Sequence, residues 1–222
     1  MGHKPYPRRR VLGASIVGLA GLALPGGLQA LAAEALPPTP AQTPGPFYPL
    51  SYPADADNDL VHVSGRAEPA KGVVTRIAGR VLGRDGNPVP GARVEIWQCD
   101  VNGRYHHVRD DRAGRPRDDN FQGYGTAVTD ERGAYRFLTI RPVPYPGRTP
   151  HIHFAVSGGG LHPFVTQMYI AGEPGNDRDQ LLRSISDPAA RARVIVALQP
   201  APEIGREALA GTFDIVLGRD AG

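Results

Sequence analysis

From residue 73 onward, short apolar runs alternate with turn signals, and this alternation limits the folds that the chain can adopt. Val, Ile, Tyr and Phe dominate the runs, and Gly, Asp, Asn and Pro bound them. Several short strands at this spacing predict a β-sandwich. The expected strand runs are VVTRIAGRVLG, ARVEIWQCD, GTAVTD, AYRFLTI, HIHFAVS, FVTQMYI, RVIVALQ and GTFDIVL.

Glycine and proline are frequent, with 28 Gly and 23 Pro among 222 residues. This composition predicts many turns and few long helices. One helix is expected near residues 177–186, DRDQLLRSIS, followed by a turn at DPAARA. The predicted fold class is therefore mainly β, a β-sandwich core with long loops and few short helices.

The first 32 residues differ from the rest of the chain. Arginines at positions 8–10 precede an uncharged run that extends to Ala33, and residues 30–32 (Ala-Leu-Ala) form a small-x-small cleavage candidate. This pattern predicts a signal peptide over residues 1–32, and the adjacent arginines indicate the twin-arginine route. The mature protein is then expected to be periplasmic or extracellular. The alternative is an uncleaved membrane anchor.

Charge and cysteine content narrow the classes of protein to which the chain can belong. The chain has a formal net charge of +3, but the predicted leader carries four of the 25 basic residues and no acidic one, which leaves 21 basic and 22 acidic residues. The basic balance therefore belongs to the leader, and no nucleic-acid partner is expected. Cys99 is the only cysteine, so no internal disulfide is expected. Beside Trp97, it is expected to be a small buried residue.

Residues 34–45, EALPPTPAQTPG, show no periodicity and predict an extended arm. We assign residues 33–72 to this N-terminal arm and residues 73–222 to one β-sandwich domain.

Two histidines lie two residues apart in PYPGRTPHIHF, residues 144–154. On a strand, residues i and i+2 point to the same face, so His151 and His153 would lie side by side. Two adjacent imidazoles can chelate a metal ion. By itself His-x-His is a weak signal, because it occurs in copper and zinc sites and also by chance.

Tyr145 strengthens the case for a metal site. It lies between Pro144 and Pro146, which restrict its backbone and aim its side chain. Only a strongly Lewis-acidic cation readily takes a phenol proton, and the resulting hard anionic oxygen favours Fe(III) over Cu(I) or Zn(II). The alternative is a turn aromatic that packs on the end of the sandwich.

Tyr105 is a second tyrosine candidate. It follows the VNGR turn directly after the run EIWQCD, so a tyrosine at this strand end could reach inward. The alternative is surface exposure. His106 and His107 follow in the same polar loop and are expected to be solvated.

Four stretches in order resemble the intradiol ring-cleaving dioxygenases, and in particular the protocatechuate 3,4-dioxygenase branch of that family. The stretches are EIWQCDVNGRY, NFQGYGTAVTDERGAYRFLTIRPVPYP, RTPHIHF and FVTQMY. The resemblance implies a non-haem Fe(III) cofactor, held by the tyrosines of GRY and PYP and by the histidines of HIHF. These residues are Tyr105, Tyr145, His151 and His153.

The resemblance also implies the chemistry. A small catecholic substrate would be cleaved with O2 to a cis,cis-muconate-type product. Tyr145 would leave the metal and help to take a substrate proton, while Arg148 would stabilise negative charge on the ring. Gln167 matches the pocket glutamine of the family. The residues expected to line the substrate cavity are Trp97, Thr43 and Pro46.

Two features set this chain apart within the family. Its segment TPAQTPGPFYP resembles the arm of the protocatechuate α chain, whereas the iron site of that enzyme lies in the β chain. Carrying both in one chain predicts a homo-oligomer, or a monomer whose own arm covers its pocket. Only five residues separate Tyr145 from His151, fewer than in the protocatechuate enzymes. We therefore expect an opened pocket, and the catechol derivative stays undetermined.

The main alternative is a non-catalytic binding module. The segments AGRVLGRDGNPVPGARVEIW and TDERGAYRFLTIRPVPYPG also resemble transthyretin-like and carboxypeptidase-regulatory-like sandwiches. Such modules need the turns and core residues but not the tyrosine and histidine set. A copper or zinc enzyme that uses the two histidines is a second alternative, and it does not account for paired tyrosines.

Overall fold

The structure is a computed structural model that describes residues 1–2, 34–112, 114–158 and 160–218. Apart from its first two residues, the predicted signal peptide lies outside the described residues. Residues 34–218 belong to one compact unit. None of the helices within the described residues is long and apolar enough to span a membrane.

The first sheet is built around β1 (Val74–Leu82). Strand β4 pairs with one side of β1 in antiparallel orientation, while β9 and β10 pair in parallel with the other side, and β8 extends β9. The bounds of these strands are β4 (Ala134–Ile140), β8 (Gln199–Pro200), β9 (Leu209–Thr212) and β10 (Ile215–Val216).

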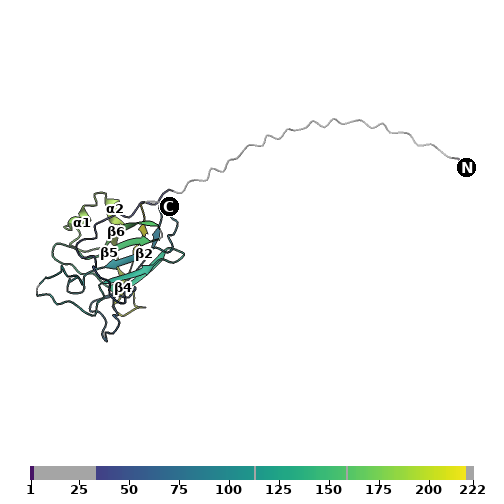
Figure 1. Ribbon diagram of the computed structural model, residues 1–222. Coiled ribbons are helices and arrows are strands. Elements are labelled where there is room, and N and C mark those ends of the chain that lie inside the picture. The colour runs from purple at the N-terminus through teal and green to yellow at the C-terminus, as the bar shows by residue number, and fades with distance from the viewer. Residues whose placement is uncertain (3–33, 113, 159, 219–222) are drawn as a thin grey trace. The chain divides into compact units, whose positions relative to one another are not determined.

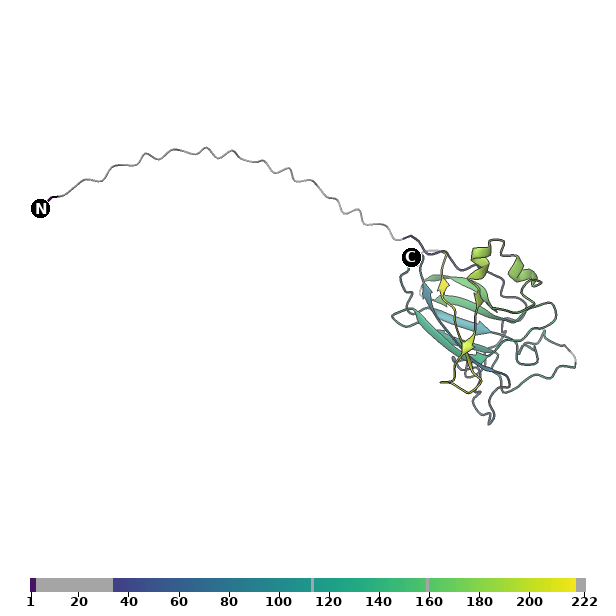
Figure 2. The ribbon, with the colours of Figure 1, turned by 180° about the vertical axis from the view of Figure 1, so that it is seen from behind.

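The second sheet has the order β3-β2-β5-β6-β7. Its first four strands pair in antiparallel orientation, and β7 pairs in parallel with β6. Its strands face the viewer in Figure 1, whereas the yellow C-terminal strands of the first sheet are in front in Figure 2. The bounds are β2 (Arg93–Trp97), β3 (Tyr124–Val128), β5 (His151–Gly158), β6 (Leu161–Ile170) and β7 (Ile195–Val196).

Strand β5 connects the core to the face that carries the candidate site. Its even-numbered residues Ile152, Phe154 and Val156 are fully buried in the main core, which includes residues of both sheets. The ring of Phe154 packs edge-on against Phe213, with centroids 5.0 Å apart. Because side chains alternate along a strand, the odd-numbered positions of β5 point away from this core. The mainly β fold class, with two packed sheets and few short helices, is confirmed.

The helices are shorter than expected. Helix α1 spans Gln180–Arg183 rather than residues 177–186, because Asp179 caps its first turn and residues 175–179 form a hydrogen-bonded loop. The DPAARA stretch, expected to be a turn, forms helix α2 (Pro188–Ala192). Asp187 is its N-cap and proline occupies the first turn, where the missing N–H has no helical partner. Both helices lie beside β6 (Figure 1).

Two of the expected strand runs are divided. RVIVALQ gives the separate two-residue strands β7 and β8, and GTFDIVL gives β9 and β10. The second break lies at Phe213 and Asp214, where the Asp214 carboxylate accepts the backbone N–H of Arg80, 2.8 Å away. This side-chain contact takes the place of a strand-to-strand hydrogen bond.

The arm over residues 34–72 contains no helix or named strand, as expected for an extended segment. It is nevertheless held along both sheets. The backbone N–H of Thr39 donates to Val216 O (2.9 Å), and that of Gln42 donates to Val165 O (2.8 Å). Farther along, Asp59 forms an isolated bridge with Leu138 of β4. The arm therefore reaches the outer face of the second sheet from the edge of the first.

Candidate active site

The two histidines of β5 lie side by side on the outer face of the second sheet. His151 and His153 are 1% and 2% exposed, and their rings are 4.9 Å apart. The strand register places His153 between Trp97 of β2 and Gln167 of β6, and His151 beside Tyr169 of β6. The two histidines share one face, as the i, i+2 spacing predicted, and side chains from three neighbouring strands meet at this end of the sheet.

Both candidate tyrosines approach the same histidine nitrogen. The phenol oxygens of Tyr105 and Tyr145 each lie 3.4 Å from His151 Nε2, and their rings meet edge-on at 5.7 Å. Tyr105 comes from the loop after β2 and is 3% exposed. Tyr145 belongs to a tight turn in which the Arg148 N–H donates to Tyr145 O (2.9 Å), with Gly147 at a φ of 82°. Two phenols and two imidazoles therefore surround one point.

The histidine nitrogens are arranged to accept a ligand. His151 Nδ1 lies 2.7 Å from Thr149 O. Because a carbonyl can only accept, Nδ1 carries the proton and the lone pair of Nε2 points to the two phenols. His153 Nδ1 is buried and has no hydrogen-bond partner among the described atoms. A buried polar nitrogen without a partner is costly unless another group satisfies it.

Burial keeps all four groups neutral in the protein without metal. It lowers the pKa of His151 to about 3, with a further contribution from the Arg148 cation, and it lowers the pKa of His153 well below its usual range. Burial likewise raises the pKa of both phenols, most strongly that of Tyr105; for Tyr145 the Arg148 cation partly opposes this rise. The imidazoles are thus in their ligating form, whereas the phenols would need a cation to lose their protons.

Arg148 is held beside Tyr145 by a network of polar groups. Its Nε donates to Asp179 Oδ2 (2.9 Å) and its Nη2 donates to Gln167 Oε1 (2.6 Å). Its Nη1 lies 3.4 Å from the Tyr145 hydroxyl. Burial alone would raise the pKa of Asp179, but the N–H of Leu182 and the Arg148 cation outweigh it and lower that pKa. Arg148 is therefore a fixed cation directed at the phenol of Tyr145.

Gln167 links this network to the arm. Its Nε2 donates to Thr43 O (3.0 Å), and its backbone N–H donates to Gln42 Oε1 (3.1 Å). The Tyr169 hydroxyl donates to Gln167 Oε1 and accepts from Gln42 Nε2. With every polar group of the Gln167 side chain in use, its amide orientation is fixed, and so is the position of the Arg148 guanidinium.

The residues expected to line the substrate cavity lie around the site in different ways. The ring of Trp97 stacks on His153 at 4.8 Å and is 1% exposed, so it packs against one face of the histidine ring. Thr43 and Pro46 lie in the exposed arm, next to Gly45, where an added Cβ would lie 3.4 Å from His153 Cε1. Their roles toward a substrate stay predictions.

Several residues of this region were missed from the sequence. Asp179, Tyr169 and Gln42 belong to the Arg148 network described above. A second group surrounds the tyrosines: the Arg112 guanidinium lies 5.1 Å from the Tyr145 ring, and Phe47 stacks on Tyr105 at 4.7 Å. Only Tyr169 had a sequence signal, because it follows Gln167 by two residues and shares its face.

The expectation of solvated loop histidines was wrong for both residues, which are half-buried. His106 Nε2 lies 3.1 Å from Asp118 O, and its ring meets Phe121 edge-on. His107 accepts the N–H of Arg109 and packs edge-on against Phe47. Packing against Phe121 and Phe47 partly covers these rings. Cys99 is buried as predicted.

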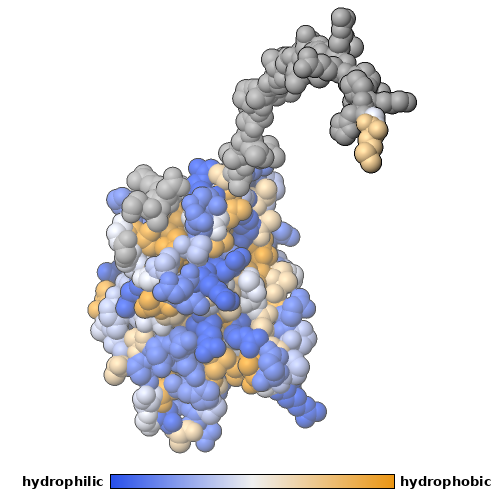
Figure 3. All heavy atoms as spheres, turned by 90° about the vertical axis from the view of Figure 1, so that its right-hand side faces the viewer, coloured by the Kyte–Doolittle hydropathy of each residue, from blue (hydrophilic) through white to orange (hydrophobic). Residues whose placement is uncertain are grey.

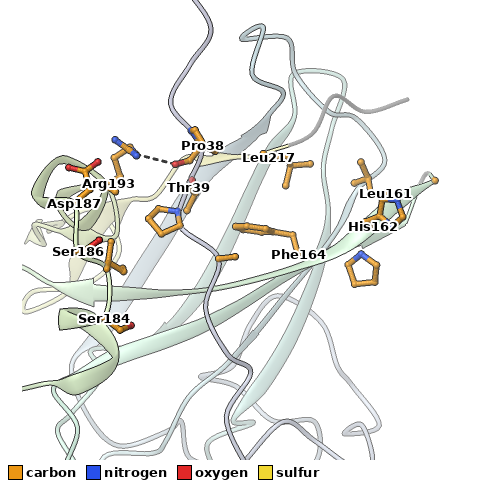
Figure 4. Close-up of a pocket in the computed structure, with 17 residues that line it drawn as sticks. Pro38, Thr39, Leu161, His162, Phe164, Ser184, Ser186, Asp187, Arg193 and Leu217 are labelled. Atoms are coloured by element: carbon orange, nitrogen blue, oxygen red, sulfur yellow. Dashed lines mark hydrogen bonds between the residues drawn. The ribbon is translucent and has the colours of Figure 1, made fainter.

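Two cavities differ in how they relate to the candidate site. The largest of those described here, about 1060 Å³, is lined by the arm, the start of β6, the segment between the two helices and one side of α2, and by none of the candidate site residues (Figure 4). One of its edges is fixed by a hydrogen bond from Arg193 to Pro38 O. A smaller cleft of about 390 Å³ is lined by Tyr145 and Arg148. The smaller cleft therefore adjoins the candidate site, whereas the larger one does not.

The four donors suit a hard trivalent metal. Two phenols and two imidazoles meet with one imidazole nitrogen unpartnered, and the hard phenolate oxygens of such a set favour Fe(III) over softer ions. Within the described ranges no group of three or more His, Cys, Asp or Glu side chains could hold a metal ion. A metal site here would therefore have to use the tyrosines.

Comparison with known proteins agrees with this arrangement. The family described as Dioxygenase matches residues 43–219. The protocatechuate 3,4-dioxygenase β chain of Burkholderia cepacia is 38% identical over 79% of this chain and 78% of its own length. The dioxygenase domain of a dioxygenase carbohydrate-binding protein fusion from Streptomyces sp. SirexAA-E has a TM-score of 0.63 at 31% identity, and the match covers 82% of this chain and 98% of that domain.

The chain therefore belongs to the intradiol ring-cleaving dioxygenase family and is an oxidoreductase. Other relatives are longer. The hydroxyquinol 1,2-dioxygenase of Corynebacterium glutamicum is 31% identical over 68% of this chain but only 56% of its own length. The binding-module alternative is not favoured, because these relatives are enzymes.

Proposed function

We propose that the chain uses a non-haem Fe(III) to cleave a catechol-type ring between its two hydroxyl-bearing carbons, with both oxygen atoms of O2 entering the product. The iron would be held by Tyr105, Tyr145, His151 and His153. The observation that carries the proposal is the approach of both phenol oxygens to within 3.4 Å of His151 Nε2. When bound, the ion would act as a Lewis acid that takes up phenolate oxygens and activates the catechol toward O2.

The surrounding side chains have separate tasks in this proposal. Tyr145, the more accessible of the two phenols, would be a phenolate when the cation is bound, and its oxygen would take a proton from the incoming catechol. Arg148 stabilises the negative charge that develops on the ring, from the position in which Gln167 and Asp179 hold it. Trp97 keeps the His153 ring in place. The two imidazoles are neutral because they are buried, so neither has to lose a proton before it binds a cation.

The substrate is a small catechol, and the reaction needs no external reductant. The carbon–carbon bond between the hydroxylated carbons breaks, and each of these carbons becomes a carboxyl carbon of a cis,cis-muconate-type product. Thr43 and Pro46 of the arm lie next to the turn over His153 and would border the bound ring. This placement supports a substrate contact from the arm.

Export and assembly complete the proposal. The arginines and apolar run before residue 33 support removal of a leader and action outside the cytoplasm. N-terminal sequencing of protein from the periplasm or medium should begin near Ala33, and an intact leader on cytoplasmic protein would refute export. Homo-oligomer assembly stays a prediction. The arm reaches the site of its own chain, so the cover of the site does not require a second copy. Light scattering of the purified protein decides it.

The visible spectrum of the purified mature protein tests the iron site. Two phenolates on Fe(III) should give a reddish protein, and catechol added without oxygen should shift and broaden the band. The variants Tyr105→Phe and Tyr145→Phe should each weaken and shift it. A protein that stays colourless after reconstitution with iron would refute the proposed ligands.

A further inference from the structure

The cleft of about 390 Å³ beside Tyr145 and Arg148 is a second space next to the proposed metal site. One wall is the turn over residues 144–150, and the other is the loop over residues 173–179. Its volume falls within the range of small-molecule sites. Because the turn between Tyr145 and His151 is only five residues long, no longer loop covers this side of Tyr145.

The outer wall of the cleft is fixed in place. The Thr149 hydroxyl donates to Asn176 Oδ1 (2.9 Å), and Asn176 Nδ2 donates to Ile170 O (2.8 Å). An added Cβ at Gly175 would lie 2.9 Å from Thr149 Oγ1, so the two walls touch at this point. The N–H of Arg178 donates to Gly175 O (3.0 Å). The backbone of Arg178 is thus held at a set position opposite Arg148.

The charges that line the cleft are neutralised with one exception. Asp179 accepts from Arg148 and from three backbone N–H groups. Glu173 is paired with Arg141. The side chain of Arg178 is exposed and makes no hydrogen bond or ion pair with any residue that the structure describes. One unmatched cation therefore stands at the mouth of a cleft whose inner wall carries two proposed catalytic residues.

We propose that this cleft receives the ring substituent of the substrate and that Arg178 binds an anionic group carried on it away from the ring. The inference rests on the proposed function and narrows its substrate class to catechols with a side chain that ends in a carboxylate. An arginine is suited to this task because its planar fork can form two hydrogen bonds with a carboxylate. A neutral catechol would still fit but would leave the Arg178 cation unpaired.

A matched pair of substrates tests the charge. Caffeate and its methyl ester have the same diol and side chain but differ in the terminal carboxylate. The wild-type enzyme should have a kcat/KM about five- to ten-fold higher for caffeate, the range expected for a partly exposed charged hydrogen bond. This preference should shrink at high salt. The Arg178 cation should raise kcat/KM less for protocatechuate, whose carboxylate is directly on the ring, than for caffeate.

Variants assign the effect to one residue. In Arg178→Gln the ratio of the two kcat/KM values should fall to near one, and Arg178→Lys should restore part of it. The control Arg183→Gln removes an exposed arginine of α1 that does not line the cleft and should keep the wild-type ratio. Equal kcat/KM for both compounds in the wild type, or an unchanged ratio in Arg178→Gln, would overturn the inference while ring cleavage stands. Cleavage of neither these compounds nor catechol would refute the proposed function itself.

Discussion

Arg148 illustrates how much of the candidate site depends on the shape of a single side chain. Its guanidinium contacts a carboxylate, an amide oxygen and the Tyr145 phenol at three different nitrogen positions. A lysine would keep the charge but could not reach all three groups from one ammonium. The position of the cation, rather than its presence alone, is therefore what the network provides.

We expect Arg148→Lys to lower kcat/KM for a catechol by about 100-fold or more, the effect of losing one fixed donor to developing charge. The resting visible band should remain, because the four proposed iron ligands are untouched. The control Arg76→Lys alters a surface pair with Glu203 and should leave activity unchanged. Steady-state kinetics together with the absorption spectrum check this. Loss of the band in Arg148→Lys would show that the arginine is needed to hold the metal instead.

The parts of the site that could be predicted at this scale are those encoded by short spacing. His151 and His153 lie on one face because they are two residues apart, and Tyr145 is next to them because a tight turn places it six positions before His151. Asp179 and Gln42 reach Arg148 and Gln167 from 31 and 125 residues away. No local pattern specifies such partners, because they depend on how the loops pack.

At the scale of elements, the short helix α1 matters more for its N-cap than for its length. The Asp179 carboxylate accepts the N–H groups of Leu181 and Leu182 through one oxygen, and Arg148 and Thr149 donate to the other. Helix α2 is capped by Asp187, which accepts one backbone N–H and pairs with no arginine in the part of the chain that the structure describes. Asp187 therefore acts as a helix cap alone, whereas Asp179 both caps a helix and positions Arg148.

We expect Asp179→Asn to lower the free energy of unfolding by about 2–3 kcal/mol, because it leaves a mostly buried arginine without its counter-charge. Asp187→Asn should change it by less than about 0.5 kcal/mol, since asparagine caps helices as well as aspartate does. Urea denaturation of both variants checks this. Equal losses would mean that Asp179 acts only as a cap.

The stability difference between wild type and Asp179→Asn should depend on pH. The pKa of Asp179 in the folded protein is below its usual value of 3.8, so its charge stabilises the folded state above that pH. This stability is lost as pH falls through the folded pKa. The gap between wild type and Asp179→Asn should be full above about pH 5 and should narrow below pH 4. A gap that stays constant across this range in urea melts would exclude the ion pair as its cause.

The strand predictions succeeded and failed for physical reasons at this scale. The long strands β1, β4, β5 and β6 were predicted because each alternates buried and exposed side chains or lies within the core. The last C-terminal run was divided because the Asp214 carboxylate accepts the backbone N–H of Arg80 at the break. The run before it starts as a strand only at Ile195, because α2 and its C-cap Arg193 occupy the preceding residues. The extent of α1 was overestimated because a capping aspartate lies inside the periodic run.

At the scale of the whole molecule, the surface gives little direct indication of the site. Hydrophilic and hydrophobic residues are mixed over the face shown in Figure 3, so no single patch stands out there. The candidate site is instead covered from outside by the arm, whose residues Thr43 and Gly45 touch Gln167 and approach His153. The arm is thus a part of the domain rather than a linker.

Removal of the arm should therefore affect both stability and metal retention. A chain that starts at Leu50 loses the hydrogen bonds of Thr39 and Gln42 to the sheets and the Thr43 contact with Gln167. At about 1 kcal/mol each, these bonds predict a loss of about 3 kcal/mol or more. Thermal melts and the rate of iron loss to a chelator check this, with a chain that starts at Glu34 as the control. Unchanged chelation rates would show that the arm does not shield the metal.

The path of the arm has a consequence for the order of events during synthesis. Residues 39–43 leave the ribosome early, yet their hydrogen-bond partners are Val165, Gln167 and Val216. The cover of the site can form only after residue 216 has been made. Until then the arm cannot close over the two histidines and the two tyrosines. The segment that covers the site is thus translated well before the residues that hold it in place.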